Sequence, residues 1–163
     1  MIKWKFNNQY NLSDKNFAKI YSFFVIESPV KGVSVRGTSF DELKISKNSL
    51  ASQIKKRLPS LSDNWKACTK GEIEYVIKDK GIFESVSLPL EVAIHIKRDD
   101  SKVDGLYYAI RCALAHGAFS LHRCKGVKYY LLENKNQGIL KGRIVLKEES
   151  LLELINVVRD LKS

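Results

Sequence analysis

The sequence has little that would place the chain in a membrane or tie it together by covalent cross-links. None of its apolar runs approaches the roughly 18 residues that a membrane-spanning helix needs. The opening segment, MIKWKFNNQYNLSD, lacks the apolar core and small residues of a secretory signal peptide. The three cysteines are odd in number and irregular in spacing, which argues against a disulfide framework. We therefore expect a cytoplasmic protein with reduced cysteines and no membrane contact.

Internal repeats, low-complexity segments and linkers are also missing from the sequence. A chain of 163 residues is long enough to bury a substantial core without dividing into two domains. We expect a single domain that covers residues 1–163.

Acidic residues are scarce relative to basic ones, and the formal net charge is +10. The imbalance is concentrated between Arg123 and Lys147, a segment with seven basic residues and only one acidic residue, Glu133. A surface of this charge suits a polyanion such as RNA, although it could also be a solvated basic face. The predicted RNA-binding residues in this region are Arg123, Lys125, Lys128, Lys141 and Arg143.

Apolar residues recur at helical spacing in four segments, each with residues that can cap or end a helix. The predicted helices run from Ser13 or Asp14 to Pro29, from Ser46 to Pro59, from Thr69 to Gly81, and from Lys147 to Lys162. The third begins with Thr-Lys-Gly-Glu, which has the form of a capping box. In the fourth, acidic residues at the start and basic residues near the end suit the helix dipole.

Other segments show a weaker or different pattern. Residues 1–12 could form a short strand or an ordered arm, and residues 30–45 an extended segment or a structured loop. Residues 82–98 are compatible with a helix that begins at Pro89 or with a partly buried strand, and we favour the helix. Residues 127–133 and 138–146 are strand-like and separated by the turn residues of Asn134–Gly138, which predicts a hairpin with a loop longer than two residues.

The stretch Asp104–His116, DGLYYAIRCALAH, is a further predicted helix, with Asp104 as its cap and Gly117 as its stop signal. Large apolar residues give it a broad buried face. Together these segments predict a mainly α protein: a bundle of five or six helices with one small β-hairpin before the C-terminal helix.

Arg111 and His116 in this stretch form the candidate catalytic pair. RNA can be cleaved without a metal ion when its own 2′-hydroxyl attacks the adjacent phosphate. A histidine can move the proton near neutral pH, and an arginine can hold the growing negative charge. Five residues on a regular helix correspond to about 140° of rotation, so the two side chains do not share a face. They converge if the helix loosens at Gly117, or if two copies of the helix meet at a dimer axis.

The string IRCALAHG resembles the signature helix of the HEPN superfamily, in which an arginine is followed by four to six residues and then a histidine. The basic hairpin and final amphipathic helix after this string also resemble small stand-alone bacterial HEPN proteins. The resemblance implies a HEPN-like helical bundle, a homodimer, and a metal-independent endoribonuclease with Arg111 and His116 as catalytic residues. It also implies a place in a toxin–antitoxin or phage-defence system, RNA and an antitoxin protein as partners, and no cofactor.

The sequence departs from the family pattern at two positions. Cys112 stands where the family often has a polar residue that supports the site, and a thiol is a weak hydrogen-bond partner. Ala118 stands where some HEPN toxins have a tyrosine that receives a nucleotide, so this control is not expected. The alternative function is a non-catalytic HEPN-like module that binds RNA, a nucleotide or a protein partner.

Three further predictions concern individual side chains. The residues Cys112, His116, His122 and Cys124 lie in a short window, but their spacing matches no common zinc site, so no metal is expected. His95 lies in an apolar run and is expected to be a packed histidine. Tyr129 and Tyr130 could stack on bases, although aromatic residues on strands usually pack in the core.

Overall fold

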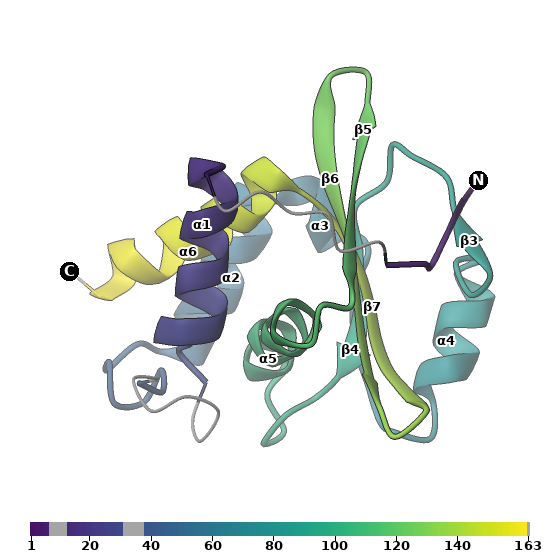
Figure 1. Cartoon of the computed structure of the whole chain (residues 1–163). Coiled ribbons are helices and arrows are strands. Elements are labelled where there is room, and N and C mark those ends of the chain that lie inside the picture. The colour runs from purple at the N-terminus through teal and green to yellow at the C-terminus, as the bar shows by residue number, and fades with distance from the viewer. Residues whose placement is uncertain (7–12, 31–37, 163) are drawn as a thin grey trace.

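A computed structural model describes residues 1–6, 13–30 and 38–162 of the chain. Its centre is a five-stranded mixed sheet with the strand order β2-β4-β7-β6-β5 (Figure 1). The strands are Trp65–Cys68 (β2), Val92–Ile96 (β4), Phe119–Cys124 (β5), Val127–Asn136 (β6) and Ile139–Lys147 (β7). β2 and β4 are parallel, and the other neighbouring strands are antiparallel. A small second sheet pairs Ile2–Lys3 (β1) with Ser85–Val86 (β3).

The helices cover the two faces of the large sheet unequally (Figure 1). One side carries Lys15–Tyr21 (α1), the π-helical turns Ser22–Glu27 (η1), Lys47–Arg57 (α2), Lys102–Ala115 (α5) and Glu148–Lys162 (α6). The short helix Pro59–Ser62 (α3) connects α2 to β2. The other side carries Ile73–Asp79 (α4) and the β1–β3 sheet. Each side buries its own apolar cluster, and the larger one lies under the helices around α5.

The fold is therefore α/β, and the prediction of a mainly helical, HEPN-like bundle is wrong. The predicted hairpin exists, but β2, β4 and β5 extend it into a sheet that separates two layers. Residues 82–98 form β3 and β4 with a loop between them, not a helix. β4 is an interior strand of the sheet and covered on both faces, and four of its five residues are buried. Such a strand shows an unbroken apolar run instead of alternation, so its sequence alone does not distinguish it from a helix.

Most of the other predicted elements are confirmed. The Asp14 carboxylate accepts hydrogen bonds from two backbone N–H groups and caps α1, and the Ser46 hydroxyl caps α2. The capping box before α4 is not formed as expected, because the Thr69 hydroxyl donates directly to the Glu72 carboxylate at 2.5 Å. Of the segments with a weaker pattern, residues 7–12 and 31–37 lie outside the described residues.

The β6–β7 hairpin is longer than predicted. β6 continues through Asn136, so that only Gln137 and Gly138 form the turn. Both have positive φ values, 51° and 77°, as the two-residue hairpin turn requires. The register then shifts: Asn134 is opposite Gly142 and Lys135 is opposite Leu140, which leaves Lys141 as the extra residue of a β-bulge.

Helix α5 lies unusually close to β4, and a glycine makes this possible. A Cβ atom at Gly105 would lie 2.4 Å from the Ile96 carbonyl oxygen and 2.8 Å from His95 Nδ1. His95 is fully buried, as expected for a packed histidine. It accepts a hydrogen bond from Trp65 Nε1 at 2.8 Å, and its Nδ1 lies 3.0 Å from the Ile96 oxygen. These contacts fix the start of α5 against the end of β4.

Candidate functional site

Helix α5 carries the predicted catalytic pair and is the most deeply buried helix on its side of the sheet. It begins one residue after Ser101, whose hydroxyl accepts a hydrogen bond from the Asp104 N–H. The predicted cap, Asp104, instead lies inside the first turn and pairs with Lys47 at 2.7 Å. Ten of the 14 residues of α5 are buried. The helix is therefore held rigidly, and only a narrow stripe of it can meet a ligand.

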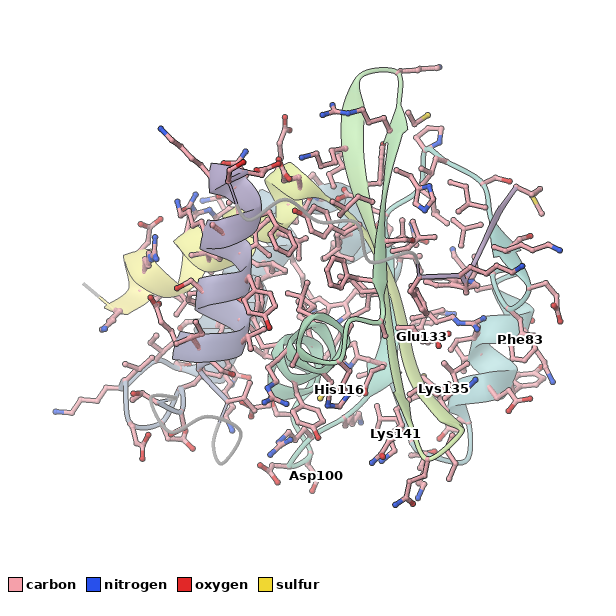
Figure 2. All side chains as sticks on the ribbon, viewed as in Figure 1. Phe83, Asp100, His116, Glu133, Lys135 and Lys141 are labelled. Carbon is pink, nitrogen blue, oxygen red and sulfur yellow. The ribbon has the colours of Figure 1, made fainter. Side chains whose placement is uncertain are left out.

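This stripe contains Arg111, which is half-buried, together with Tyr108 and Ala115. His116 is exposed and forms the C-terminal cap, with φ −92° and ψ 1°. Figure 2 shows His116 at the end of α5 next to the sheet. α5 is regular through Ala115. The side chains at positions 111 and 116 therefore point in directions about 140° apart around the helix axis. The loosening predicted at Gly117 is not found. Gly117 has φ 68° and ends the helix in a compact cap, in which the N–H groups of Gly117 and Ala118 donate to the carbonyl oxygens of Leu114 and Ala113.

Cys112 points into the protein from the flank of this stripe and is only 4% exposed. Burial raises the pKa of the neighbouring Tyr108 hydroxyl, and a hydrogen bond with the Cys112 thiol adds to the shift. The guanidinium of Arg98 covers the Tyr108 ring, with 3.9 Å between its Cζ and the ring centroid. Cys112 therefore supports Tyr108, which in turn orients Arg98.

Two of the predicted RNA-binding residues are engaged with carboxylates of the protein itself. Lys128 Nζ lies 2.8 Å from Asp14 and 3.2 Å from Glu148, and its hydrogen bond with Asp14 raises the pKa of the ammonium group. Arg143 pairs with Glu133 at 2.8 Å, and both side chains are nearly buried. Both residues thus have a role in holding the fold.

Arg143 is surrounded on its remaining sides as well. Its guanidinium also donates to the Phe83 carbonyl oxygen and lies over the Trp4 ring at 4.7 Å. It links β7 to the α4 layer, on the side of the sheet away from α5.

The remaining predicted RNA-binding residues divide between the two ends of β6. Arg123 and Lys125 are exposed at the β5–β6 turn. Lys141 lies near the opposite end, beside the β6–β7 turn (Figure 2). β6 is 10 residues long, which corresponds to about 34 Å. The basic region predicted as continuous is therefore two separate groups.

Lys141 belongs to a cavity that the sequence did not reveal. The cavity has a volume of about 150 Å³ and lies between the end of β4, the N-terminal half of α5 and the β6–β7 hairpin. Its polar lining consists of Lys70, Lys97, Arg98, Tyr108, Asn134 and Lys141, and the rest comprises Ile96, Gly105 and Ala109. Four cations line it and no carboxylate does. Lys70, Lys97 and Arg98 come from outside the predicted basic region, and Lys97 and Arg98 are the last two residues of the segment 82–98 that was taken for a helix.

β6 contacts both the cavity and the segment that follows His116. The N–H of Glu133 donates to the Ala118 carbonyl oxygen at 2.9 Å, which extends the β5–β6 pairing toward Gly117. Asn134, the next residue of β6, lines the cavity. On α5, positions 105, 109, 112 and 116 share one face at helical spacing. Gly105 and Ala109 line the cavity, so His116 lies at the end of the same face.

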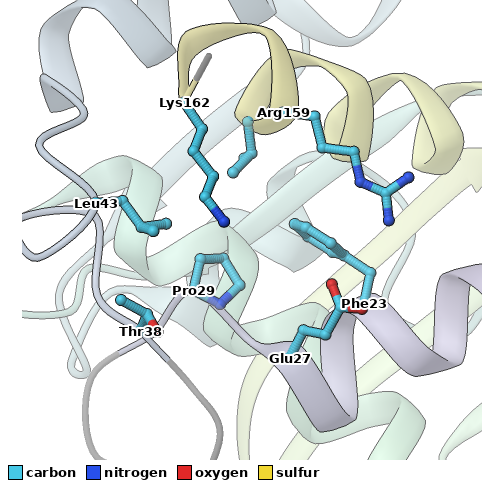
Figure 3. A pocket seen from close by; sticks show the side chains of 8 residues that line it. Phe23, Glu27, Pro29, Thr38, Leu43, Arg159 and Lys162 are labelled. Atoms are coloured by element: carbon cyan, nitrogen blue, oxygen red, sulfur yellow. The ribbon is translucent and has the colours of Figure 1, made fainter.

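A second cavity, of about 230 Å³, lies between η1 and α6 (Figure 3). Arg159 and Lys162 of α6 and Glu27 of η1 are among its lining residues, together with apolar side chains such as Phe23 and Leu43. Because Glu27 contributes a negative charge, this cavity suits a polyanion less well than the one beside α5.

The four side chains considered as zinc ligands do not form a site. His122 Nε2 lies 2.9 Å from the Ser120 hydroxyl on β5, and burial lowers the pKa of His122. Within residues 1–6, 13–30 and 38–162, no three histidine, cysteine or acidic side chains are grouped to hold a metal ion. In the same residues no helix has the length and apolar character needed to cross a bilayer. Tyr129 and Tyr130 are both buried, so their rings do not face a ligand.

Searches against protein-family models, curated proteins and solved structures give no match for this chain.

Proposed function

We propose that this protein binds RNA and cleaves it without a metal ion, with Arg111 and His116 of α5 as the catalytic residues. The observation that supports this most is that His116 is exposed at the C-terminal end of α5, while the N-terminal half of the same rigid helix borders a basic cavity. A strand of RNA with a phosphate in that cavity would extend over the protein surface toward His116. The resemblance of IRCALAHG to the HEPN signature also supports the proposal. This support comes from the sequence only, since the fold is not the helical bundle that the resemblance implied.

The proposed reaction is transesterification. His116 takes the proton of a ribose 2′-hydroxyl, and the 2′ oxygen forms a bond to the adjacent phosphorus. The bond from phosphorus to the 5′ oxygen of the next nucleotide breaks, and that oxygen takes a proton from water. The products are a 2′,3′-cyclic phosphate and a 5′-hydroxyl. The guanidinium of Arg111 stabilises the extra negative charge on the phosphate oxygens in the transition state.

The angle between the two residues favours a site built from two copies of the chain. Arg111 and His116 of one α5 point in directions about 140° apart, so one copy does not readily place both on one phosphate. If two α5 helices meet along the stripe of Tyr108, Arg111 and Ala115, Arg111 of one copy can face His116 of the other. A homodimer is therefore part of the proposal.

The test is incubation of the protein with end-labelled single-stranded RNA in EDTA, followed by analysis of the product ends. We expect cyclic phosphate ends, and a loss of about 10²-fold or more in rate for His116→Ala and for Arg111→Ala. Lys19→Ala removes an exposed positive charge from α1 and is the matched control, with an unchanged rate. Cleavage that requires Mg²⁺, or that survives His116→Ala, would contradict the proposal.

The second candidate function is a module that binds RNA without cutting it. Cys112 favours this alternative, because the residue next to Arg111 is buried beside Tyr108 and cannot support a reacting group. Binding of the RNA by the wild-type chain, without cyclic phosphate products, would favour this function over the first.

A further inference from the structure

We propose that the cavity between β4, α5 and the β6–β7 hairpin binds a phosphate group through Lys97, Arg98 and Lys141. This site is separate from the catalytic pair, since neither Arg111 nor His116 lines the cavity. It therefore stands whether or not the protein cleaves RNA.

The positive charges that line this cavity are not neutralised by a carboxylate among its lining residues. Lys70, Lys97 and Lys141 make no ion pair among the described residues, in contrast to Lys128, which pairs with two carboxylates. Several like charges around one small volume repel one another, and the repulsion is stronger beside a low-dielectric protein wall than in water. A bound anion removes this repulsion, so the cavity is suited to one.

Four other cavities on the described part of the chain differ in this respect. Each of the four includes at least one glutamate: Glu27 near η1, Glu91 near α3, Glu74 near α4 and Glu148 at the start of α6. The absence of a carboxylate from the cavity beside α5 is thus a feature of this site and not a general result of the high net charge.

The backbone directs the donors into the cavity. Lys141 is the extra residue of the β-bulge, and its neighbour Leu140 packs on the α4 side of the sheet while Lys141 lines the cavity beside α5. Bulges are common where a strand must re-aim a side chain next to a site. Arg98 is oriented by its stack on Tyr108, and an oriented guanidinium can bind phosphate oxygens in pairs.

The side-chain amide of Asn134 adds an uncharged hydrogen-bond donor to the cations of the cavity. Asn134 is only 7% exposed, and its side-chain amide has no hydrogen-bond partner among the described residues. It lines the cavity, so a ligand oxygen there could accept from the amide N–H. A nearly buried amide that lacks a protein partner is expected to find one in a ligand or in water.

The size of the cavity limits what enters it. A volume of about 150 Å³ is below the roughly 300 Å³ at which pockets begin to enclose drug-sized ligands. It is several times the roughly 30 Å³ that a water molecule occupies in the liquid. The size of a phosphate group lies within this range, whereas a whole nucleotide is larger than the cavity. The phosphate could belong to a free nucleotide or to an RNA backbone, with the sugar and base outside the cavity.

The test measures binding by calorimetry with three probes: inorganic phosphate, adenosine monophosphate, and a short 2′-O-methyl RNA that cannot undergo 2′-hydroxyl attack. We expect the variant with Lys97→Gln and Lys141→Gln to bind each probe that the wild type binds at least tenfold more weakly, because two charge-assisted hydrogen bonds are lost. The variant with Lys19→Gln and Lys56→Gln is the control, since both lysines are exposed on helices and lie in no described cavity. It has the same net charge as the cavity variant. Circular dichroism and thermal unfolding establish that both variants are folded.

The probes also identify the source of the phosphate. Binding of the RNA but not of the monophosphate indicates a backbone phosphate, and the reverse indicates a free nucleotide; either supports the site. Equal weakening in the cavity and control variants would overturn it, because binding would then follow net charge alone. Failure of the wild type to bind any of the three probes would overturn it as well. Because none of the probes can be cleaved, these results do not depend on catalysis by His116.

Discussion

Replacement of Gly105 by alanine tests the close packing that places α5 beside the cavity. The new Cβ would lie 2.4 Å from the Ile96 carbonyl oxygen and 2.8 Å from His95 Nδ1, both well inside van der Waals contact. The nearest atom belongs to the backbone of β4, so it cannot turn away as a flexible side chain could. The helix must move outward by roughly 1 Å, given that non-bonded atoms settle near 3.5 Å.

Two opposing terms decide the size of the effect. Alanine is favoured over glycine inside a helix by about 1 kcal/mol. Overpacking of a tight core costs about 1–3 kcal/mol, and the shift also disturbs the hydrogen bonds of His95 with Trp65 and Ile96, each worth about 1 kcal/mol. We therefore expect Gly105→Ala to lower the free energy of unfolding by about 1–3 kcal/mol.

Urea unfolding, followed by tryptophan fluorescence, measures this change as a lower midpoint with the same slope. The matched control is Gly71→Ala, because a Cβ at Gly71 would meet no atom within 4 Å and its φ is not positive. We expect this variant to stay within about 0.5 kcal/mol of the wild type or to be slightly more stable. If Gly105→Ala is as stable as Gly71→Ala, the described contact of α5 with β4 is wrong.

Two further predictions concern buried charged and titratable groups. Glu133→Gln leaves the guanidinium of Arg143 without its counter-charge, so we expect a loss of about 3–5 kcal/mol in the free energy of unfolding, measured by urea titration; an effect below about 1 kcal/mol would contradict a buried pair. Burial lowers the pKa of His95 from its usual 6.5 to about 4. Between these pH values the unfolded chain binds a proton that the folded chain does not. Stability should therefore fall by about 3 kcal/mol as the pH decreases from 7 to 4, and His95→Gln should remove most of this slope.

The sequence predicts helices and turns well where the determining signals are local. The amphipathic pattern of α6 and the cap at Ser46 depend on residues within a few positions of each other. The β6–β7 hairpin was predicted as well, but with a longer loop than the two-residue turn at Gln137–Gly138. β4 was mistaken for a helix because its burial on both faces results from α4 and α5, which pack on it from opposite sides. β5 was missed because His122 and Arg123 interrupt its apolar pattern, and its strand geometry comes from pairing with β6.

In the candidate site as well, the sequence predicts what depends on neighbouring residues and does not predict what depends on residues far apart in the chain. Arg111 and His116 could be selected from the sequence because they lie on one helix. The basic cavity could not, because Lys70, Arg98 and Lys141 come from three segments that meet only when β4 pairs with β7 and α5 packs across them. Nor could the sequence show that Lys128 and Arg143 are paired with carboxylates, since Asp14 is 114 residues away from Lys128 along the chain.

The regular geometry of α5 leads to a test of the two-copy site. Arg111→Ala and His116→Ala should each lower the cleavage rate by about 10²-fold or more, since every site in either homodimer lacks one residue. If each site takes Arg111 from one copy and His116 from the other, a mixed dimer of the two variants contains one site with neither residue and one intact site. Equal amounts of the two inactive proteins, unfolded and refolded together, should then regain about a quarter of wild-type activity, because half of the dimers are mixed and each has one of its two sites.

Each variant refolded alone is the control and should stay inactive. If both residues act within one copy, every site in the mixture still lacks one of them, and no activity returns. Failure of the mixture to recover, with the wild type active and dimeric after the same treatment, would refute the shared site. Catalysis would then require His116 to turn back toward Arg111 within one chain, which the helical geometry through Ala115 opposes.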